Sequence, residues 1–159
     1  MNNAEILDLA GRIERKMADI YRFFAECFSH DENYSSLWKG MAEEEDAHAG
    51  FLDAKFRMVM LSPQSFGLSI MDKEDIEETY DRLVEMEKTI RKGPLRIQDA
   101  VRMALQMELE LVEKSYNKLV DTGDPVIRRI FDELTRGDHH LEKLAATAAR
   151  LGVKIRYAN

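Results

Sequence analysis

Two side chains that can bind a metal ion lie inside the apolar stripe of a predicted long helix, within residues 41–49. At about 100° per residue, Glu45 and His48 fall on the same face as the apolar residues of this helix. They are one turn apart, so they can direct a carboxylate oxygen and an imidazole nitrogen at one ion. An acidic helix can also contain this spacing by chance. The metal hypothesis therefore depends on whether other helices contribute carboxylates to the same core.

Two further predicted helices carry an acidic residue at or near the inner face. Glu14 lies at the edge of the apolar stripe of a helix over residues 4–28, roughly 75° from the centre of the stripe. It can point inward, or it can reach solvent along its aliphatic stem. Glu108 lies near the middle of the inner face of a helix over residues 96–120. An unpaired glutamate at that position would cost several kcal/mol or remain protonated.

The last predicted helix, over residues 125–151, contains an acid and a histidine in a different arrangement. Asp138 interrupts the inner stripe, whereas His140 lies beyond its edge, roughly 110° from the centre. We therefore expect Asp138 to determine metal occupancy more strongly than His140. His140 is expected to contribute only if the helix is distorted near Gly137.

These four helices together predict a cluster of carboxylates in one core. Such a cluster is stable only if cations neutralise it, and mixed oxygen and imidazole ligands suit iron or manganese. A pair of divalent ions satisfies both requirements. The alternative is a metal-free core in which His48 and the acids form a hydrogen-bonded network.

Length and composition favour a single helical domain over residues 1–159. The chain has 45% hydrophobic residues, 8 glycines and 3 prolines, and it contains no run of alternating β-branched residues. The predicted elements are four long helices and one shorter helix within a long connection. Their ranges are residues 4–28, from a cap at Ser35 or Ser36 to 61, 72–91 for the shorter helix, 96–120 and 125–151.

Charge and cysteine content exclude several functions. A net charge of -7 argues against a nucleic-acid partner. One cysteine, Cys27, excludes an internal disulfide and a four-cysteine iron or zinc module within this sequence. Neither a signal peptide nor an apolar run of membrane-spanning length is found, so we expect a cytoplasmic protein without membrane contact.

The pattern resembles that of the ferritin-like superfamily, and within it the rubrerythrin-like proteins. Those proteins take one glutamate from each of two helices and a Glu-x-x-His motif from each of the other two. Glu14 followed by Tyr21 is similar to the first-helix motif, Glu45 with His48 to the second, and Glu108 to the third. The resemblance covers about residues 4–150.

The fourth helix departs from this pattern in either possible register. One register places Asp138 at the glutamate position and Leu141 at the histidine position. The other places His140 at the histidine position and Gly137 at the glutamate position. The second metal can therefore be held weakly, can use His140 after a local distortion, or can be absent.

The resemblance implies an all-α, ferritin-like four-helix bundle with a long crossover, which allows the second and third core helices to run parallel. It also implies two iron ions, with manganese or zinc as alternatives, and reduction of peroxide or dioxygen. Tyr21 is either a donor of a hydrogen bond or an electron near the site, or a core tyrosine. An external electron donor such as a rubredoxin and a homodimer are further expectations. The rival functions are metal storage without redox turnover and a metal-free helical interaction protein.

Overall fold

The computed structural model describes residues 3–67, 73–113, 125, 128–129 and 139–154, with side chains omitted for 110–113. Every regular element in these ranges is helical, which confirms the predicted all-α bundle. The elements are α1 (Asn3–Cys27), α2 (Glu32–Leu61), the short 3-10 helix η1 (Pro63–Ser65), α3 (Lys73–Ile90), α4 (Ile97–Glu113) and α6 (His140–Arg150).

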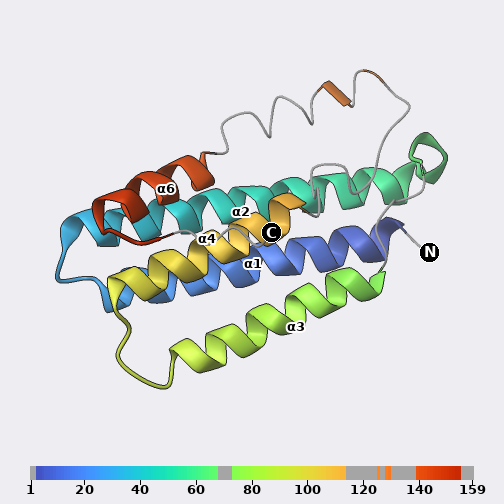
Figure 1. The fold of residues 1–159 in the computed structure, drawn as a ribbon. Coiled ribbons are helices and arrows are strands. Elements are labelled where there is room, and N and C mark those ends of the chain that lie inside the picture. The colour runs from blue at the N-terminus through green and yellow to red at the C-terminus, as the bar shows by residue number, and fades with distance from the viewer. Residues whose placement is uncertain (1–2, 68–72, 114–124, 126–127, 130–138, 155–159) are drawn as a thin grey trace.

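The four helices α1, α2, α4 and α6 lie side by side and form the core of the molecule (Figure 1). The connection from α2 to α4 carries the chain back along the bundle, so α2 and α4 run in the same direction and α1 and α6 in the opposite direction (Figure 1). The predicted crossover is therefore present. It contains α3, which packs on the outer side of α1 and forms an ion pair there between Glu87 and Lys16, at 2.7 Å.

The start of α2 differs from the sequence prediction. The helix begins at Glu32, because Asp31 is its cap and accepts hydrogen bonds from the backbone N–H groups of Asn33 (2.9 Å) and Tyr34 (3.3 Å). An aspartate at this position satisfies backbone donors that the first turn otherwise leaves unpaired. The predicted caps at Ser35 or Ser36 are therefore wrong.

The last predicted helix also differs, because α6 begins only at His140. The preceding residue, His139, has φ -122° and ψ 20°, which lies outside the helical range. The prediction of one uninterrupted helix over residues 125–151 is therefore wrong at His139. At the other end, Gly152 adopts φ 66° and its N–H donates to the carbonyl of Ala149, as is common at helix ends.

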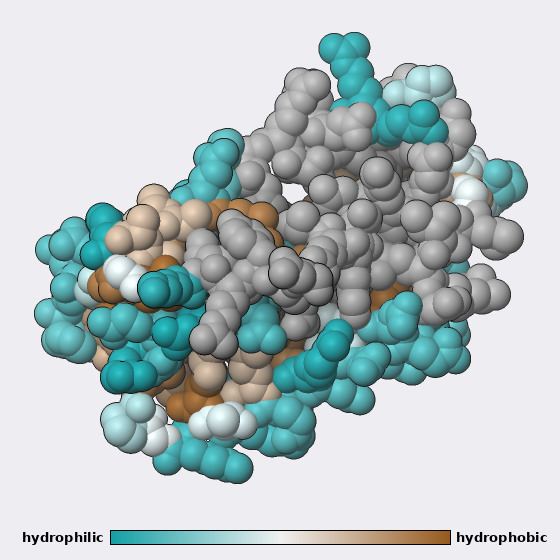
Figure 2. Space-filling model, viewed as in Figure 1, coloured by the Kyte–Doolittle hydropathy of each residue, from teal (hydrophilic) through white to brown (hydrophobic). Residues whose placement is uncertain are grey.

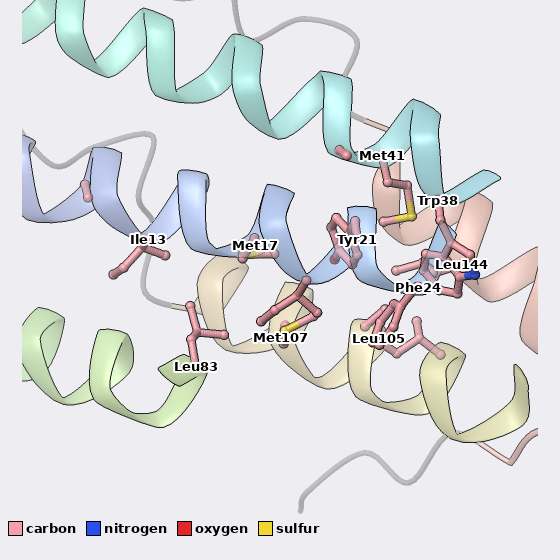
Figure 3. Close-up of a cluster of buried hydrophobic side chains, with 14 of the residues drawn as sticks. Ile13, Met17, Tyr21, Phe24, Trp38, Met41, Leu83, Leu105, Met107 and Leu144 are labelled. Carbon is pink, nitrogen blue, oxygen red and sulfur yellow. The ribbon is translucent and has the colours of Figure 1, made fainter. Parts of the chain in front are cut away.

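The core next to α6 is built largely from aromatic and sulfur-containing side chains (Figure 3). Tyr21 and Phe24 of α1 pack against Trp38 of α2, with ring centroids 5.7 and 5.0 Å from the Trp38 ring. All three side chains are fully buried. This packing holds α1 and α2 in a fixed register at the level where Tyr21 reaches toward α4.

On the face shown in Figure 2, hydrophilic residues make up most of the described surface, with smaller hydrophobic patches between them. Ion pairs such as Arg15 to Asp53 (2.5 Å) connect α1 and α2 on this surface, and exposed pairs of this kind contribute little to stability. Among the described residues, none of the helices combines the length and the apolar character needed to cross a membrane.

Candidate metal centre

Four helices direct polar side chains into the middle of the bundle. Glu14 comes from α1, Glu45 and His48 from α2, Glu108 from α4, and His140 from α6. The three glutamates and His140 are buried, with exposed fractions of 7% for Glu14, 1% for Glu45, 5% for Glu108 and 2% for His140. This is a rare concentration of ionisable groups for a protein core.

The first group of ligand atoms joins α1 and α2. Nδ1 of His48 lies 3.1 Å from Oε2 of Glu45 and 3.7 Å from Oε2 of Glu14. The side chain of His48 remains 28% exposed, so this group lies toward the edge of the bundle. Its ligand atoms all lie within 4.8 Å of one another, close enough to bind one ion.

The second group joins α2, α4 and α6. Nδ1 of His140 lies 3.1 Å from Oε1 of Glu45 and 3.3 Å from Oε1 of Glu108. All three side chains are buried, and their ligand atoms again lie within 4.8 Å of one another. This group is therefore deeper in the core than the first.

Glu45 belongs to both groups. Its Oε2 faces His48 and its Oε1 faces His140, while the two imidazole ring centroids are 5.5 Å apart. Oε1 of Glu45 is buried and accepts no hydrogen bond of regular geometry within the described part of the chain. A buried carboxylate oxygen without a donor is costly, and a cation at this position would satisfy it. The donor set therefore fits a pair of metal ions that share one carboxylate.

Protons neutralise the first group when no cation is present. Burial and the adjacent charge of Glu45 raise the pKa of Glu14 to about 8. Burial disfavours a charged imidazole, but Glu14 and Glu45 outweigh this effect and raise the pKa of His48 to about 10. A metal ion that binds here must therefore displace protons.

The same balance holds in the second group. Burial of His140 opposes its charged form, yet Glu108 and Glu45 raise the pKa of this imidazole to about 11. Ion pairing between the imidazolium and the two carboxylates thus supplies the positive charge that a bound cation would otherwise provide. In both groups, a divalent ion would take the place of protons held by the same side chains.

Tyr21 lies directly behind the second group. Its hydroxyl donates a hydrogen bond to Oε1 of Glu108, with an O–O distance of 2.6 Å. Burial and the charge of Glu108 raise the pKa of Tyr21 well above its usual value, so the phenol keeps its proton. The hydrogen bond orients the carboxylate of Glu108 toward His140.

Five of the six residues predicted as metal ligands lie in these two groups: Glu14, Glu45, His48, Glu108 and His140. Asp138, the sixth, lies outside the described residues. The predicted outward direction of His140 is wrong. The helical wheel assumed a continuous helix through residue 139, and the break at His139 changes the direction in which the following residues point.

Glu44 is the site residue that the sequence did not reveal. Its Oε2 lies 2.6 Å from Nε2 of His140, on the side of the ring opposite to Glu45. In the sequence, Glu44 belongs to a continuous run of four acids, residues 43–46 of α2, and no pattern separates it from the exposed ones. Only the position of α6 identifies it.

Comparison with known proteins agrees with this geometry. The rubrerythrin family model matches residues 5–148, a range that contains both groups of ligand atoms and all but the outer ends of the core helices. No curated protein and no solved structure matched the chain. Because the family match extends over nearly the whole sequence and includes each of the site residues, this chain belongs to the rubrerythrin family.

Proposed function

We propose that this protein binds two iron ions in the bundle core and reduces peroxide or dioxygen with the electrons of the ferrous state. The observation that carries this proposal is the position of Glu45, whose two oxygens face two separate groups of ligand atoms. A shared carboxylate would hold two ions close enough to act on one small oxidant. Membership of the rubrerythrin family supports iron over the alternatives manganese and zinc.

The residues divide between the two ions in a simple way. Glu14, Glu45 and His48 would hold the first ion, and Glu45, Glu108 and His140 the second. Iron bound there in the ferrous state would supply the two electrons that, with two protons, convert one peroxide molecule to two water molecules. Three carboxylates do not fully balance two divalent ions. Asp138 remains our predicted source of a fourth negative charge.

The protein controls the surroundings of the site. Tyr21 holds Glu108 in place, and the buried rings of Phe24 and Trp38 keep water away from this side of the core. Within these 159 residues there is one cysteine, so this sequence does not build a four-cysteine iron centre. We therefore propose an external electron donor, such as a rubredoxin, and a reducing compartment such as the cytoplasm.

The association state is a separate part of the proposal. We propose a homodimer, as the resemblance implies. The described surface includes two exposed large apolar side chains, Met60 (58% exposed) and Leu61 (83% exposed), at the end of α2. Multi-angle light scattering of the purified protein should give twice the mass of the chain, and the mass of one chain would contradict the dimer.

A metal-free core is the rival function that one observation favours, because each histidine lies close enough to a buried carboxylate to form an ion pair with it. The two functions predict different metal binding. Anaerobic titration with ferrous iron, followed by metal analysis after gel filtration, should give two ions per chain. If no iron remains bound, the iron proposal is wrong, and if manganese and zinc also fail to bind in the same titration, the metal-free role is correct.

Redox activity is tested on the same loaded protein. Stopped-flow mixing with peroxide should oxidise the two ferrous ions at a ratio of one peroxide to two ions, far faster than iron in buffer. Glu43→Ala provides the matched control, because Glu43 lies on α2 next to the site but is exposed. Two bound ions that react no faster than free iron would identify a storage protein instead.

A further inference from the structure

Glu44 contacts the one side of His140 that the metal centre does not use. Its Oε2 lies 2.6 Å from Nε2 of His140, whereas Nδ1 of the same ring faces Glu45 and Glu108. Consecutive residues of α2 thus place a carboxylate next to each of the two ring nitrogens. The two carboxylates have different roles. The second oxygen of Glu45 faces His48 in the other group of ligand atoms, whereas that of Glu44 faces Lys143.

The carboxylate of Glu44 is itself fixed at both ends. Its Oε1 forms an ion pair with the ammonium group of Lys143, which follows His140 by three residues on α6. Its Oε2 is buried and accepts no hydrogen bond of regular geometry from the described residues, so the nearby ring nitrogen is its available charged partner. Glu44 therefore connects α2 to the first turn of α6 through two charged groups.

His140 needs such support because it is the first residue of α6. No turn of α6 precedes it, and the adjoining His139 is not helical and makes no side-chain cap on the helix. The preceding turn limits the rotamers of a mid-helix residue such as His48 in α2, and the first residue of a helix lacks this restriction. A histidine ligand is commonly held by a carboxylate at its second nitrogen, which fixes the ring and selects the nitrogen that binds the metal.

We propose that Glu44 is a positioning residue, which holds Nε2 of His140 so that Nδ1 is presented to the second metal ion, with Lys143 as its anchor. This inference rests on the proposed two-metal site and adds a residue that does not itself bind metal. It also explains how His140 can be a ligand although Gly137 stands where the family motif has a glutamate. The carboxylate of Glu44 supplies the orientation that a regular helix would otherwise provide.

Cobalt(II) titration tests the proposal through affinity and through the visible absorption bands of the bound ion. Wild-type protein should bind two equivalents. Glu44→Ala should still bind two, with the second about 10- to 100-fold weaker, which is the usual effect of removing a carboxylate that orients a histidine ligand. Glu44→Gln keeps an acceptor oxygen of the same shape and should recover most of this affinity. Glu43→Ala should behave as wild type.

Two results of this titration would overturn the proposal. Unchanged affinity in Glu44→Ala would show that the ring needs no such support. Complete loss of one equivalent, as expected for His140→Ala, would show that Glu44 is a ligand. Lys143→Met should cause a smaller weakening than Glu44→Ala, because it removes only the anchor.

A second measurement needs no metal. In proton NMR spectra of the metal-free protein, a ring N–H held by a carboxylate exchanges slowly with water and resonates downfield. We expect this signal for Nε2 of His140 in wild type and Glu43→Ala, and its loss in Glu44→Ala and His140→Ala. Its presence in a protein that binds no cobalt would support the role of Glu44 in orienting the ring and reject the metal centre. Its persistence in Glu44→Ala would contradict the positioning role.

Discussion

The two groups of ligand atoms differ in how the chain assembles them. In the first, Glu45 and His48 are one helical turn apart on α2, and only Glu14 comes from another helix. In the second, Glu45, Glu108 and His140 come from three helices. The first group is partly local and lies at the edge of the bundle, whereas the second forms only when α4 and α6 have packed.

This difference decides what supports each histidine. His48 is held within a continuous helix, whose backbone fixes the direction of the side chain. His140 begins a helix and depends on contacts with Glu44, Glu45 and Glu108. We therefore expect the second group to be the more sensitive to substitutions outside the ligands, while Glu45 should affect both groups.

The largest expected effect follows from removing the shared carboxylate. Glu45→Ala should reduce bound ferrous iron from two ions per chain to less than one, because each group loses a ligand. Glu43→Ala, an exposed neighbour on the same helix, should leave two. The measurement is iron and protein content after gel filtration without oxygen. If Glu45→Ala retains one tightly bound ion, the two groups do not depend on a common carboxylate.

Removing one histidine at a time should separate the two groups. His48→Ala and His140→Ala should each lose about one ion, and helical circular dichroism should be largely retained at room temperature.

Asp138→Asn is the informative comparison for the last helix, since the sequence pattern assigned Asp138 the larger role. From the burial of His140 we expect His140→Ala to lose more metal than Asp138→Asn. The opposite order would restore the register in which Asp138 is the main ligand.

Proton uptake by both groups predicts how the stability of the metal-free protein depends on pH. The pKa of Glu14 is raised to about 8, so its ionisation above its unfolded pKa disfavours the folded state. The imidazolium groups of His48 and His140 stabilise the fold at low pH. This contribution is lost as pH rises through about 10 and about 11, their folded pKa values.

The ionisations of Glu14, His48 and His140 all act in the same direction, so the metal-free protein should become less stable as pH rises from about 6 to about 9. We expect the melting temperature to fall by several degrees, at about 2–4 °C per kcal/mol for a protein of this size. Glu14→Gln should reduce this dependence without affecting the part due to His140. Iron affinity should change in the opposite sense and rise with pH, because binding displaces protons. A melting temperature that rises with pH would contradict the proton-neutralised core.

Tyr21→Phe should have the smallest effect on metal content and should act on the second group alone. It removes the hydroxyl that donates to Glu108, a hydrogen bond to a charged group worth about 2 kcal/mol in unfolding free energy. Two ions should still bind, the second more weakly. Tyr34→Phe, on the first turn of α2, is the control. Equal weakening of both ions would show that Tyr21 supports the core as a whole.

The contrast between the two groups also explains what could be predicted from the sequence. The all-α bundle and the inward direction of Glu45 and Glu108 follow from helical periodicity and were predicted correctly, and the crossover was expected from the family resemblance. For Glu14, at the edge of its stripe, periodicity left both an inward and a solvent-facing direction open, and the structure shows it buried. Periodicity describes a continuous helix, so it could not place His140 once the helix was broken at His139.

Contacts between distant residues account for the remaining differences. Glu44 is 96 positions from His140 in the sequence, and no local pattern distinguishes it from the exposed acids beside it.

The start of α2 was misplaced for a local reason. Aspartate and serine both cap helices, and both occur within residues 31–36. The extended backbone at Asp31 and its hydrogen bonds to the first turn make Asp31 the cap.

The central claim is that two metal ions share Glu45, and the magnetic state of the iron tests it most directly. Protein loaded with ferrous iron should be oxidised by one equivalent of peroxide for each pair of ions and examined by electron paramagnetic resonance and Mössbauer spectroscopy. If the two ferric ions share Glu45, their spins should couple antiferromagnetically. The ground state is then diamagnetic and silent in electron paramagnetic resonance. A strong signal of isolated high-spin ferric ions, accounting for all the iron bound, would contradict the shared site.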